Sequence, residues 1–584
     1  ATVCAHGEPV TGVTFDQGEQ AMSLKTTRAR TAVLALVSAI ALVAAACGGD
    51  DSGDGGDGGS SGGSDSANII GPGEDEGTPV YGGEVSYGLE AENTGGWCLP
   101  EGQLAISGIQ VARTIYDTLT APNADGEFVP FLAETVEPNE DNTVWTIKLR
   151  EGVKFHDGSD LTAEVVKNNL DAYRGAYPSR QPLLFLFVFD NIASVDVVDD
   201  LTLTVTTNEP WPALPAFLYG SGRIGMLAQA QLDDTETCDT KLIGTGPFQL
   251  EEWVVNDFLS ATRFEDYWQT DSEGNQLPYL DKITYRPFVE EDARFNALQG
   301  GQLNAMHTND PELVSQLLSE AEAGSLTLWQ SDEYSEVSYV MFNSSKAPFD
   351  TKNAREAVAL AIDRDEIRSV RFLDVPTMAS GPFAPGSVGY LEDTGFPETD
   401  LEAAQAAADA YEAETGEPLT FSMTIYGSVS TQQTVQLIQQ QLERIGVEMM
   451  IESIDQAQQI STALGNDWQS QYWRNHPGGD PDQQLVWWDS ESPVNFGKFS
   501  DPEIDDLLAR GRVTSDPAER QQIYEELNRE FADELYNVWM NWSIWTIATA
   551  NDVRGVFGPD LPDGSGPFPG LAVGNPVSGM WIEQ

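Results

Sequence analysis

The side chains best suited to act on a small molecule gather in residues 471–499, which read QYWRNHPGGDPDQQLVWWDSESPVNFGKF. This segment is rich in Trp, Gly, Pro and Asn and has little periodicity, as is typical of a loop at a binding surface. Tryptophan rings are rigid and provide contact area at a low cost in conformational entropy. Trp473, Trp487 and Trp488 are therefore candidate ligand-binding residues, and ordinary core packing is the alternative for each of them.

Polar side chains could bind a charged group of the ligand. Asp480 lies in a Gly-Asp-Pro-Asp sequence and could contact a cation, although this sequence also favours a turn. His476 could contact the ligand through an imidazole whose ordinary pKa is about 6.5. Trp97 and Asn343, far away in the sequence, are further candidates for the ligand site.

The sequence does not indicate a catalytic or metal site. The chain has 4 His, and those outside the leader, His156, His307 and His476, do not stand at a spacing that pairs them with Cys, Glu or another His. The pattern G-x-S-x-G occurs in the Gly/Ser-rich residues 58–63, whose composition predicts no strand and helix to present a nucleophile, and not in the rest of the chain. We therefore predict a binding protein that is not an enzyme and has no cofactor. A secreted hydrolase that uses two of the many carboxylates is the alternative.

The charge balance is strongly acidic. The chain has 30 Lys and Arg against 93 Asp and Glu, a formal net charge of −63. Such a charge repels nucleic acid and disfavours adsorption to an anionic membrane surface. A well-solvated surface explains it, and life in high salt or capture of cationic ligands are the alternatives. We predict no nucleic-acid partner.

An export signal occupies the beginning of the chain. Lys25, Arg28 and Arg30 precede an apolar run of about sixteen residues, which is shorter than the roughly twenty of a spanning helix. The sequence VAAAC at residues 43–47 resembles a bacterial lipobox, in which Cys47 would receive a lipid and become the N-terminus. Ordinary cleavage that leaves a free Cys47 is the alternative. We assign residues 1–46 to targeting and expect residues 1–21 to be non-native.

A flexible linker follows the signal. Residues 47–79 consist largely of Gly, Ser and Asp and have too few apolar side chains to form a core. We expect this linker to tether a folded body to the outer face of the bacterial cytoplasmic membrane.

Cysteine usage agrees with export. Cys4 and Cys47 belong to the targeting region, which leaves Cys98 and Cys238 as a pair in an oxidising compartment. We predict a disulfide between them, with two free thiols as the alternative.

Residues 143–170 have the clearest local structure in the chain. Apolar and polar residues alternate from residue 145 to residue 150, which predicts a strand with one buried face. Asp157-Gly158 favours a tight turn. Thr162 can cap a helix whose apolar residues Val166 and Leu170 are four positions apart.

This stretch also carries a resemblance. The pattern LR-x-G-V-x-F-x-D-G, followed by L-T-A-x-x-V, resembles the extracellular solute-binding proteins of family 5, which deliver oligopeptides, dipeptides, nickel and some sugars to ABC transporters. The resemblance covers roughly residues 82–557. It implies an α/β fold of the periplasmic-binding-protein type II (class C), with two large lobes around a ligand cleft and a smaller extra domain.

The resemblance also divides the chain. Sequence GTGPF at residues 244–248 resembles the return from the small domain to lobe I, and residues 339–343 resemble the strand that enters lobe II. A helix is expected at residues 350–367, and a strand, a helix and a strand at residues 421–451. The expected parts are lobe I (80–116, 244–335 and 550–584), the small domain (117–243) and lobe II (336–549).

The implied function is capture of a small solute, with an oligopeptide or dipeptide favoured, and its delivery to ABC permease subunits by a monomer. In peptide-binding relatives, a Trp that matches Trp473 is followed three positions later by an Asp that receives the peptide amino group. Here that position is His476. An oligosaccharide or a metal chelate is the alternative solute, and a structural or adhesive surface protein is the alternative class.

Overall fold

The computed structural model describes residues 70–71, 77–93, 95–102, 104–182, 185–333, 336–475, 478–571 and 577–584. They belong to one compact unit, Gly63–Gln584. The predicted signal, Cys47, nearly all of the linker and His476 lie outside the described residues. Within the described ranges, every helix is too short or too polar to cross a bilayer.

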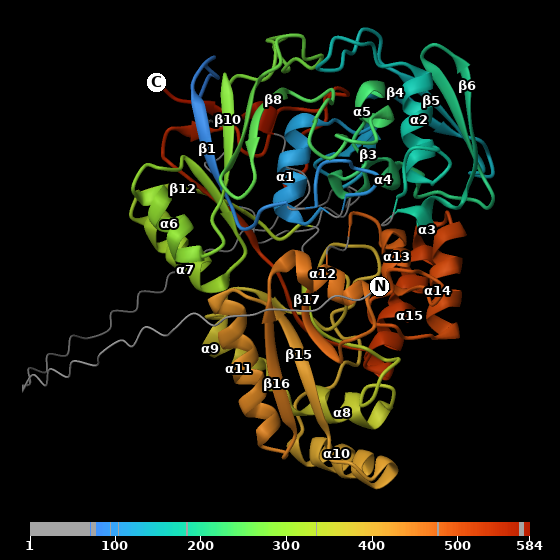
Figure 1. Ribbon diagram of the computed structural model, residues 1–584, viewed down its shortest axis with the longest axis vertical. Coiled ribbons are helices and arrows are strands. Elements are labelled where there is room, and N and C mark those ends of the chain that lie inside the picture. The colour runs from blue at the N-terminus through green and yellow to red at the C-terminus, as the bar shows by residue number, and fades with distance from the viewer. Residues whose placement is uncertain are drawn as a thin grey trace, which may run out of the picture. The chain divides into compact units, whose positions relative to one another are not determined.

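Lobe I is built on a seven-stranded mixed sheet with the order β12-β19-β11-β1-β10-β9-β8 (Figure 1). β1 lies at its centre and runs parallel to both β10 and β11, whereas the other pairings are antiparallel. The strands are β1 (Glu84–Leu89), β8 (Phe248–Val254), β9 (Phe258–Arg263), β10 (Lys282–Pro287), β11 (Ala305–Thr308), β12 (Thr327–Ser331) and β19 (Trp545–Thr549). The accompanying elements are α1 (Ile106–Ile115), α6 (Glu291–Gln299), α7 (Pro311–Glu322), β20 (Val553–Arg554), η3 (Val577–Gly579) and β21 (Trp581–Ile582).

The small domain holds the strand, turn and helix predicted at residues 143–170. In β5, Trp145, Ile147 and Leu149 are buried and the residues between them are exposed, so the predicted alternation is confirmed. Thr162 caps α2 by accepting a hydrogen bond from the Val165 amide. The sheet has the order β4-β5-β7-β6. The elements of the small domain are β2 (Thr120–Pro122), β3 (Phe128–Pro130), β4 (Ala133–Pro138), β5 (Val144–Leu149), α2 (Ala163–Tyr173), α3 (Leu186–Phe189), β6 (Ile192–Asp199), β7 (Thr202–Thr207), α4 (Leu214–Tyr219), η1 (Gly220–Gly222) and α5 (Gln229–Asp233).

Lobe II is built on a six-stranded sheet with the order β14-β18-β13-β17-β15-β16. The predicted strand, helix and strand are confirmed as β15, α11 and β16, with the two strands parallel and adjacent (Figure 1). The elements are β13 (Val337–Phe342), α8 (Lys352–Ala361), α9 (Arg364–Arg371), β14 (Thr377–Met378), α10 (Leu401–Thr415), β15 (Thr420–Tyr426), α11 (Val429–Glu443), β16 (Glu448–Ile454), α12 (Gln456–Leu464), β17 (Ser470–Asn475), η2 (Pro481–Gln484), α13 (Leu485–Trp488), α14 (Pro502–Val513), α15 (Pro517–Glu534) and β18 (Asn537–Trp542).

Two local predictions for lobe II are wrong. The helix expected at residues 350–367 is two helices, because the Asp363 side chain accepts a hydrogen bond from the Glu366 amide and starts a new helix there. The loop expected at residues 471–499 begins as a strand, β17, which pairs with β13 and β15 inside the sheet.

Two crossings connect lobe I with lobe II. The segments between β12 and β13 and between β18 and β19 run side by side, since the Ser543 amide donates a hydrogen bond to the Glu336 carbonyl oxygen at 2.8 Å. β19 already pairs with β11 and β12. The chain therefore re-enters lobe I at Trp545, a few residues before the boundary expected at residue 550.

The turn at residues 244–248 fits its predicted structural role. The Gly246 amide donates to the Ile115 carbonyl oxygen at 2.9 Å. A side chain on Gly244 or Gly246 would overlap the backbone of Ile115, so this close approach requires glycine.

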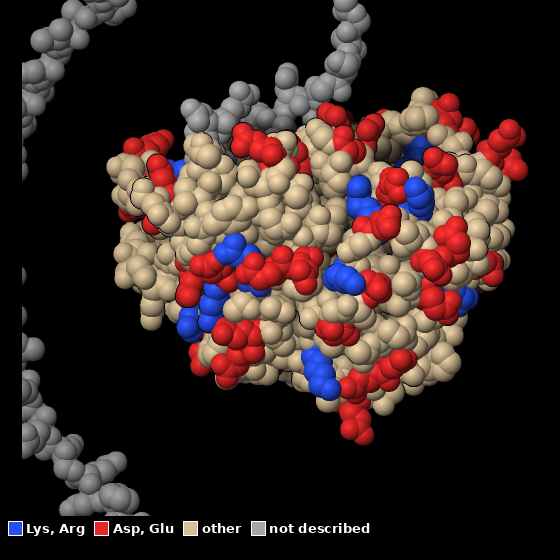
Figure 2. Space-filling model, turned by 90° about the horizontal axis from the view of Figure 1, so that it is seen from above, with Lys and Arg blue, Asp and Glu red and all other residues tan. Residues whose placement is uncertain are grey.

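On the face of the molecule that Figure 2 shows, the acidic side chains do not gather in one patch. Figure 2 shows acidic side chains over all parts of one face of the molecule, several of them beside basic ones. The distribution on this face is that of a mixed, well-solvated surface.

Candidate ligand-binding site

A cavity of about 210 Å³ lies between the sheets of lobes I and II. Both sheets direct the carboxyl ends of parallel strands toward it, which is the usual place of a ligand in an open α/β sheet. The cavity is lined by Glu90, Leu104, Ala105, Arg223, Glu291, Asn309, Asp310, Pro311, Glu336, Ser338, Phe372, Tyr426, Ser428, Ser430, Thr431, Thr434, Gln459, Ile460, Leu464, Tyr472, Trp473, Arg474, Asn475, Trp487, Val494, Phe496, Asn541 and Ser543.

Lobe I contributes polar residues that each follow one of three neighbouring parallel strands. Glu90 comes directly after β1, Glu291 follows β10, and Asn309 and Asp310 follow β11. Because the carboxyl ends of adjacent parallel strands meet at one edge of the sheet, these side chains reach the same side of the cavity.

Lobe II contributes hydroxyl groups and aromatic rings. Ser428, Ser430 and Thr431 stand at the beginning of α11, where the Ser428 side chain caps the helix by accepting from the Thr431 amide at 3.1 Å. Trp473 on β17 and Trp487 on α13 are half-buried in the cavity wall. Their rings lie 5.2 and 5.4 Å from the ring of Phe496, so the three form one aromatic wall.

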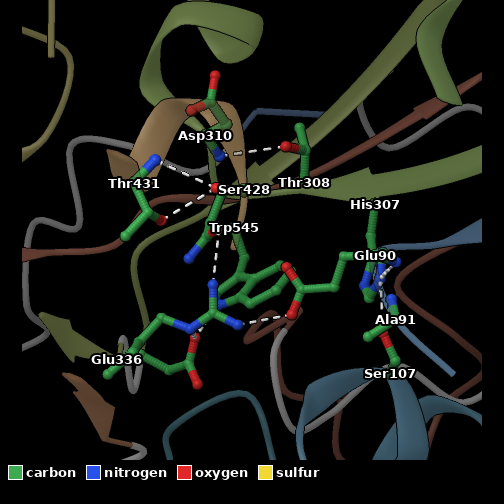
Figure 3. A network of polar contacts seen from close by, with 12 residues as sticks. Glu90, Ala91, Ser107, His307, Thr308, Asp310, Glu336, Ser428, Thr431 and Trp545 are labelled. Carbon is green, nitrogen blue, oxygen red and sulfur yellow. Dashed lines mark hydrogen bonds and ion pairs between the residues drawn. The ribbon is translucent and has the colours of Figure 1, made fainter. Parts of the chain in front are cut away.

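Arg474 is the centre of a polar network in this cavity. Its Nη2 donates to Glu90 Oε1 at 2.6 Å, its Nε lies 2.9 Å from Glu336 Oε2, and its Nη1 donates to Asn309 Oδ1 at 3.0 Å. The guanidinium also lies over the ring of Trp545, 5.4 Å from its centroid. Glu90 and Glu336 both pair with this one cation, and Figure 3 shows these two side chains beside Trp545.

Burial and pairing move the carboxyl groups of the cavity in opposite directions. Burial alone would raise the pKa of Glu90, but the Arg474 guanidinium outweighs it and holds this pKa below its ordinary value. Burial raises the pKa of Glu336 to about 7 although Arg474 is beside it. Burial, with Asp310 nearby, also raises the pKa of Glu291 to about 7.

Behind Glu90, a buried histidine supports the site without carrying charge. The Glu90 amide donates to His307 Nε2 at 3.1 Å, as Figure 3 shows, so this nitrogen is an acceptor. Burial lowers the pKa of His307 to about 3, which keeps the imidazole neutral.

Of the tryptophans predicted to bind ligand, Trp473 and Trp487 line the cavity. Trp488 does not, because its side chain points the other way on the short helix and packs against Phe531 at 4.8 Å, with 3% of its surface exposed. Trp97 is 1% exposed and packs against Trp253 at 5.8 Å. Both belong to the hydrophobic core.

The polar residues predicted to bind ligand, Asn343 and Asp480, form hydrogen bonds with other parts of the protein. Asn343 is fully buried and donates to the Trp468 carbonyl oxygen at 2.9 Å. Asp480 caps η2 and accepts two hydrogen bonds from Arg520, at 2.5 and 2.7 Å. Neither is among the residues that line the cavity.

Reasoning from the sequence missed all six charged residues that line the cavity, among them Glu90, Glu291 and Arg223. Glu90 and Glu291 could have been found from their position in the sequence, because each comes shortly after a strand. The sequence signal for Arg474 is its position directly after Trp473, within the segment predicted to bind ligand.

The predicted disulfide is confirmed. Cys98 and Cys238 are bonded, with their Cα atoms 5.1 Å apart, and the free-thiol alternative is wrong. The bridge joins the loop after β1 to the small domain, where Arg180 Nη1 donates to Cys98 Sγ at 2.7 Å.

Comparison with known proteins gives consistent matches. The family model described as bacterial extracellular solute-binding proteins, family 5 Middle, matches residues 127–496. The glutathione-binding protein GsiB of Salmonella typhimurium (strain LT2) is 31% identical over 433 residues, which cover 71% of this chain and 81% of that protein.

Solved structures match the fold. The peptide complex of the periplasmic binding protein DppA from Helicobacter pylori aligns with a TM-score of 0.76 at 21% identity, covering 86% of this chain and 99% of that one. The agropinic acid complex of AgaA from A. tumefaciens R10 aligns with a TM-score of 0.74 at 24% identity, also covering 86% and 99%.

Proposed function

Because this chain belongs to the bacterial extracellular solute-binding proteins of family 5, which serve ABC importers and are not enzymes, we propose that it captures a small peptide between its lobes. The closed protein would then deliver the peptide to the permease subunits of its transporter. Lobe closure around a ligand is a common hinge motion in two-lobed binding proteins.

The size of the cavity supports a short ligand. Pockets for drug-sized molecules commonly measure about 300–1,000 Å³. At about 210 Å³, this cavity favours a dipeptide or tripeptide over a longer oligopeptide.

The observation that carries the proposal is the pairing of an aromatic wall with one available carboxylate and one available guanidinium. Glu291 forms no ion pair with any basic side chain that the structure describes. Arg223 lines the cavity and donates its Nε to the Leu104 carbonyl oxygen at 2.9 Å. A zwitterionic peptide would place its amino group at Glu291 and its carboxylate at Arg223, with a side chain against Trp473 and Trp487.

The charge of the cavity favours some classes of peptide over others. Four carboxylates and two guanidinium groups line the cavity. This surplus favours a neutral or cationic peptide over an anionic one such as glutathione, the ligand named for GsiB. Titration calorimetry with dipeptides, tripeptides and glutathione, together with mass spectrometry of co-purifying solutes, tests the proposal. Recovery of an oligosaccharide or a metal chelate instead would contradict it.

Replacing Glu291 with Gln should weaken binding of a free-amine dipeptide about tenfold or more at pH 8, since a charge-assisted hydrogen bond is lost. An N-acetylated dipeptide should bind the variant and the native protein equally. The matched control is Glu290→Gln, because Glu290 is exposed beside Glu291 and does not line the cavity. Equal loss with the acetylated dipeptide would show that Glu291 does not receive the amine.

The same carboxyl group predicts a pH dependence. With its pKa raised to about 7, Glu291 is mostly protonated at pH 6 and mostly ionised at pH 8. The protonated amino group of a peptide binds the ionised form, so affinity should rise from about pH 6 to about pH 7.5, above which the amino group itself begins to lose its proton. Glu336, whose pKa is also raised to about 7, titrates in both proteins, so the difference between native protein and Glu291→Gln isolates Glu291. A constant ratio of the two affinities across this range would contradict the assignment.

We further propose that the protein acts outside the cytoplasmic membrane as a monomer, held there by a lipid on Cys47. Replacing Cys47 with Ser should move most of the protein from the membrane fraction to the medium, because a charge of −63 offers no electrostatic hold on anionic lipid. Retention of Cys47→Ser in the membrane fraction would disprove the anchor.

A further inference from the structure

Arg474 lies on strand β17 of lobe II, whereas the groups that its guanidinium contacts lie in lobe I or at the crossings between the lobes. Glu90 and Asn309 follow strands β1 and β11 of lobe I, and Glu336 stands in the crossing before β13. Trp545, whose ring lies under the guanidinium, stands where the other crossing enters β19. All three nitrogen positions of the guanidinium have an oxygen partner within 3.0 Å.

The charge of Arg474 is balanced by the protein itself. The side chains of Glu90 and Glu336 are 8% and 6% exposed, so each depends on this cation for compensation. The ionised Glu90 already offsets the single positive charge, and Glu336, whose pKa is about 7, is partly ionised as well, so no positive charge is left for an anionic group of a solute. Arg474 is therefore poorly suited to bind the ligand directly, although it lines the cavity.

The partners of Arg474 differ in where they lie relative to the hinge. Glu336 and Trp545 stand at the two crossings, about which the lobes would rotate, and can stay beside Arg474 when the lobes separate. Glu90 and Asn309 lie within lobe I, so they would move away from β17. Opening would thus break the 2.6 Å contact with Glu90 while the 2.9 Å contact with Glu336 persists.

Resting on the proposed function, we propose that Arg474 is a positioning residue that latches the lobes together through Glu90, independently of the solute. The closed state is then already well populated without ligand. The solute adds its own contacts to a preformed cavity, and its release requires the latch to break.

The test measures lobe separation without solute. Fluorophores placed on cysteines at Glu265 in lobe I and Asp467 in lobe II, both exposed, report the distance between lobes by energy transfer. The native protein should be mainly closed. Glu90→Gln keeps the shape of the side chain and removes its charge, and it should lower the ratio of closed to open protein about tenfold or more. Arg474→Ala should do the same.

Two further measurements separate a latch from a general structural role. Guanidinium chloride at millimolar concentration should restore closure in Arg474→Ala, because the ion can occupy the place between Glu90 and Glu336, whereas urea should not. Glu312→Gln is the matched control, because Glu312 is an exposed lobe I residue that pairs with Arg371 of lobe II at 3.7 Å. The Glu312 side chain is 65% exposed and lies 3.7 Å from Arg371, so solvent screens the pair and this variant should stay closed.

A native protein that is mainly open without solute would overturn the proposal, as would unchanged closure in Glu90→Gln. A variant that melts at a lower temperature is still interpretable, because closure is measured well below its melting temperature. The experiments distinguish failure of the peptide proposal from failure of the latch proposal. A latch that works in a protein that binds no peptide contradicts the ligand class alone, and peptide binding with unchanged closure contradicts the latch alone.

Discussion

Replacing Trp473 with Ala should weaken binding of a cognate dipeptide about thirtyfold, because truncation of a central aromatic anchor typically costs about 2 kcal/mol or more. Trp473 lines the cavity and packs edge to face against Phe496 at 5.2 Å. Its backbone is held in β17 between β13 and β15, so the side chain can be removed without displacing the strand. Titration calorimetry measures the loss.

Controls for Trp473 use the same wall of the cavity. Trp473→Phe keeps an aromatic face and should lose much less affinity than Trp473→Ala. Trp487→Ala removes the other ring that contacts Phe496 and should weaken binding in the same direction. Thermal unfolding of each variant should stay close to that of the native protein, since Trp473 is only half-buried. Native affinity in Trp473→Ala would exclude this residue from the ligand site.

Removing the disulfide should lower the free energy of unfolding by as much as about 4 to 5 kcal/mol, because the bridge closes a loop between positions 140 residues apart. Residual structure in the unfolded chain reduces the effect, so this is an upper value. Urea unfolding of Cys98→Ser/Cys238→Ser measures it, and the midpoint should fall. Reduced native protein should unfold at the same urea concentration as the double variant.

Removing the disulfide should also increase local opening of the folded protein near the two cysteine positions. The Trp97 amide donates to the Asp239 carbonyl oxygen at 2.9 Å, and Gln231 Nε2 donates to the Cys238 carbonyl oxygen at 2.8 Å. These contacts depend on the segment that the bridge holds, so hydrogen exchange should increase around residues 95–102 and 234–243. An unchanged urea midpoint would show that packing alone holds the loop.

Some elements of this fold depend on local chemistry, and the sequence alone was sufficient to predict them. The alternation in β5, the cap at Thr162 and the turn at Asp157-Gly158 act within a few residues. The glycines at 244 and 246 were predicted to form a turn, although what requires them is the distant backbone of Ile115. The pair Cys98 and Cys238 was predicted to form a disulfide, with two free thiols as the alternative. The family motif then supplied the two-lobed architecture that no periodicity could indicate.

The ligand site depends on contacts between residues far apart in the chain, which only the tertiary structure decided. Trp487 and Trp488 are neighbours in sequence, yet helix geometry turns one ring to the cavity and the other into the core. Asp480 has the sequence of a cation site, but Arg520, 40 positions later, already pairs with it.

Glu90 and Arg474 show the same limit most clearly. They are 384 positions apart and meet at 2.6 Å because β1 and β17 end at facing edges of two different sheets. Neither residue has a sequence neighbour that predicts this pairing. Sequence thus determined the elements, whose causes are local, while the packing of the two sheets determined which charges are neutralised and which remain for a ligand.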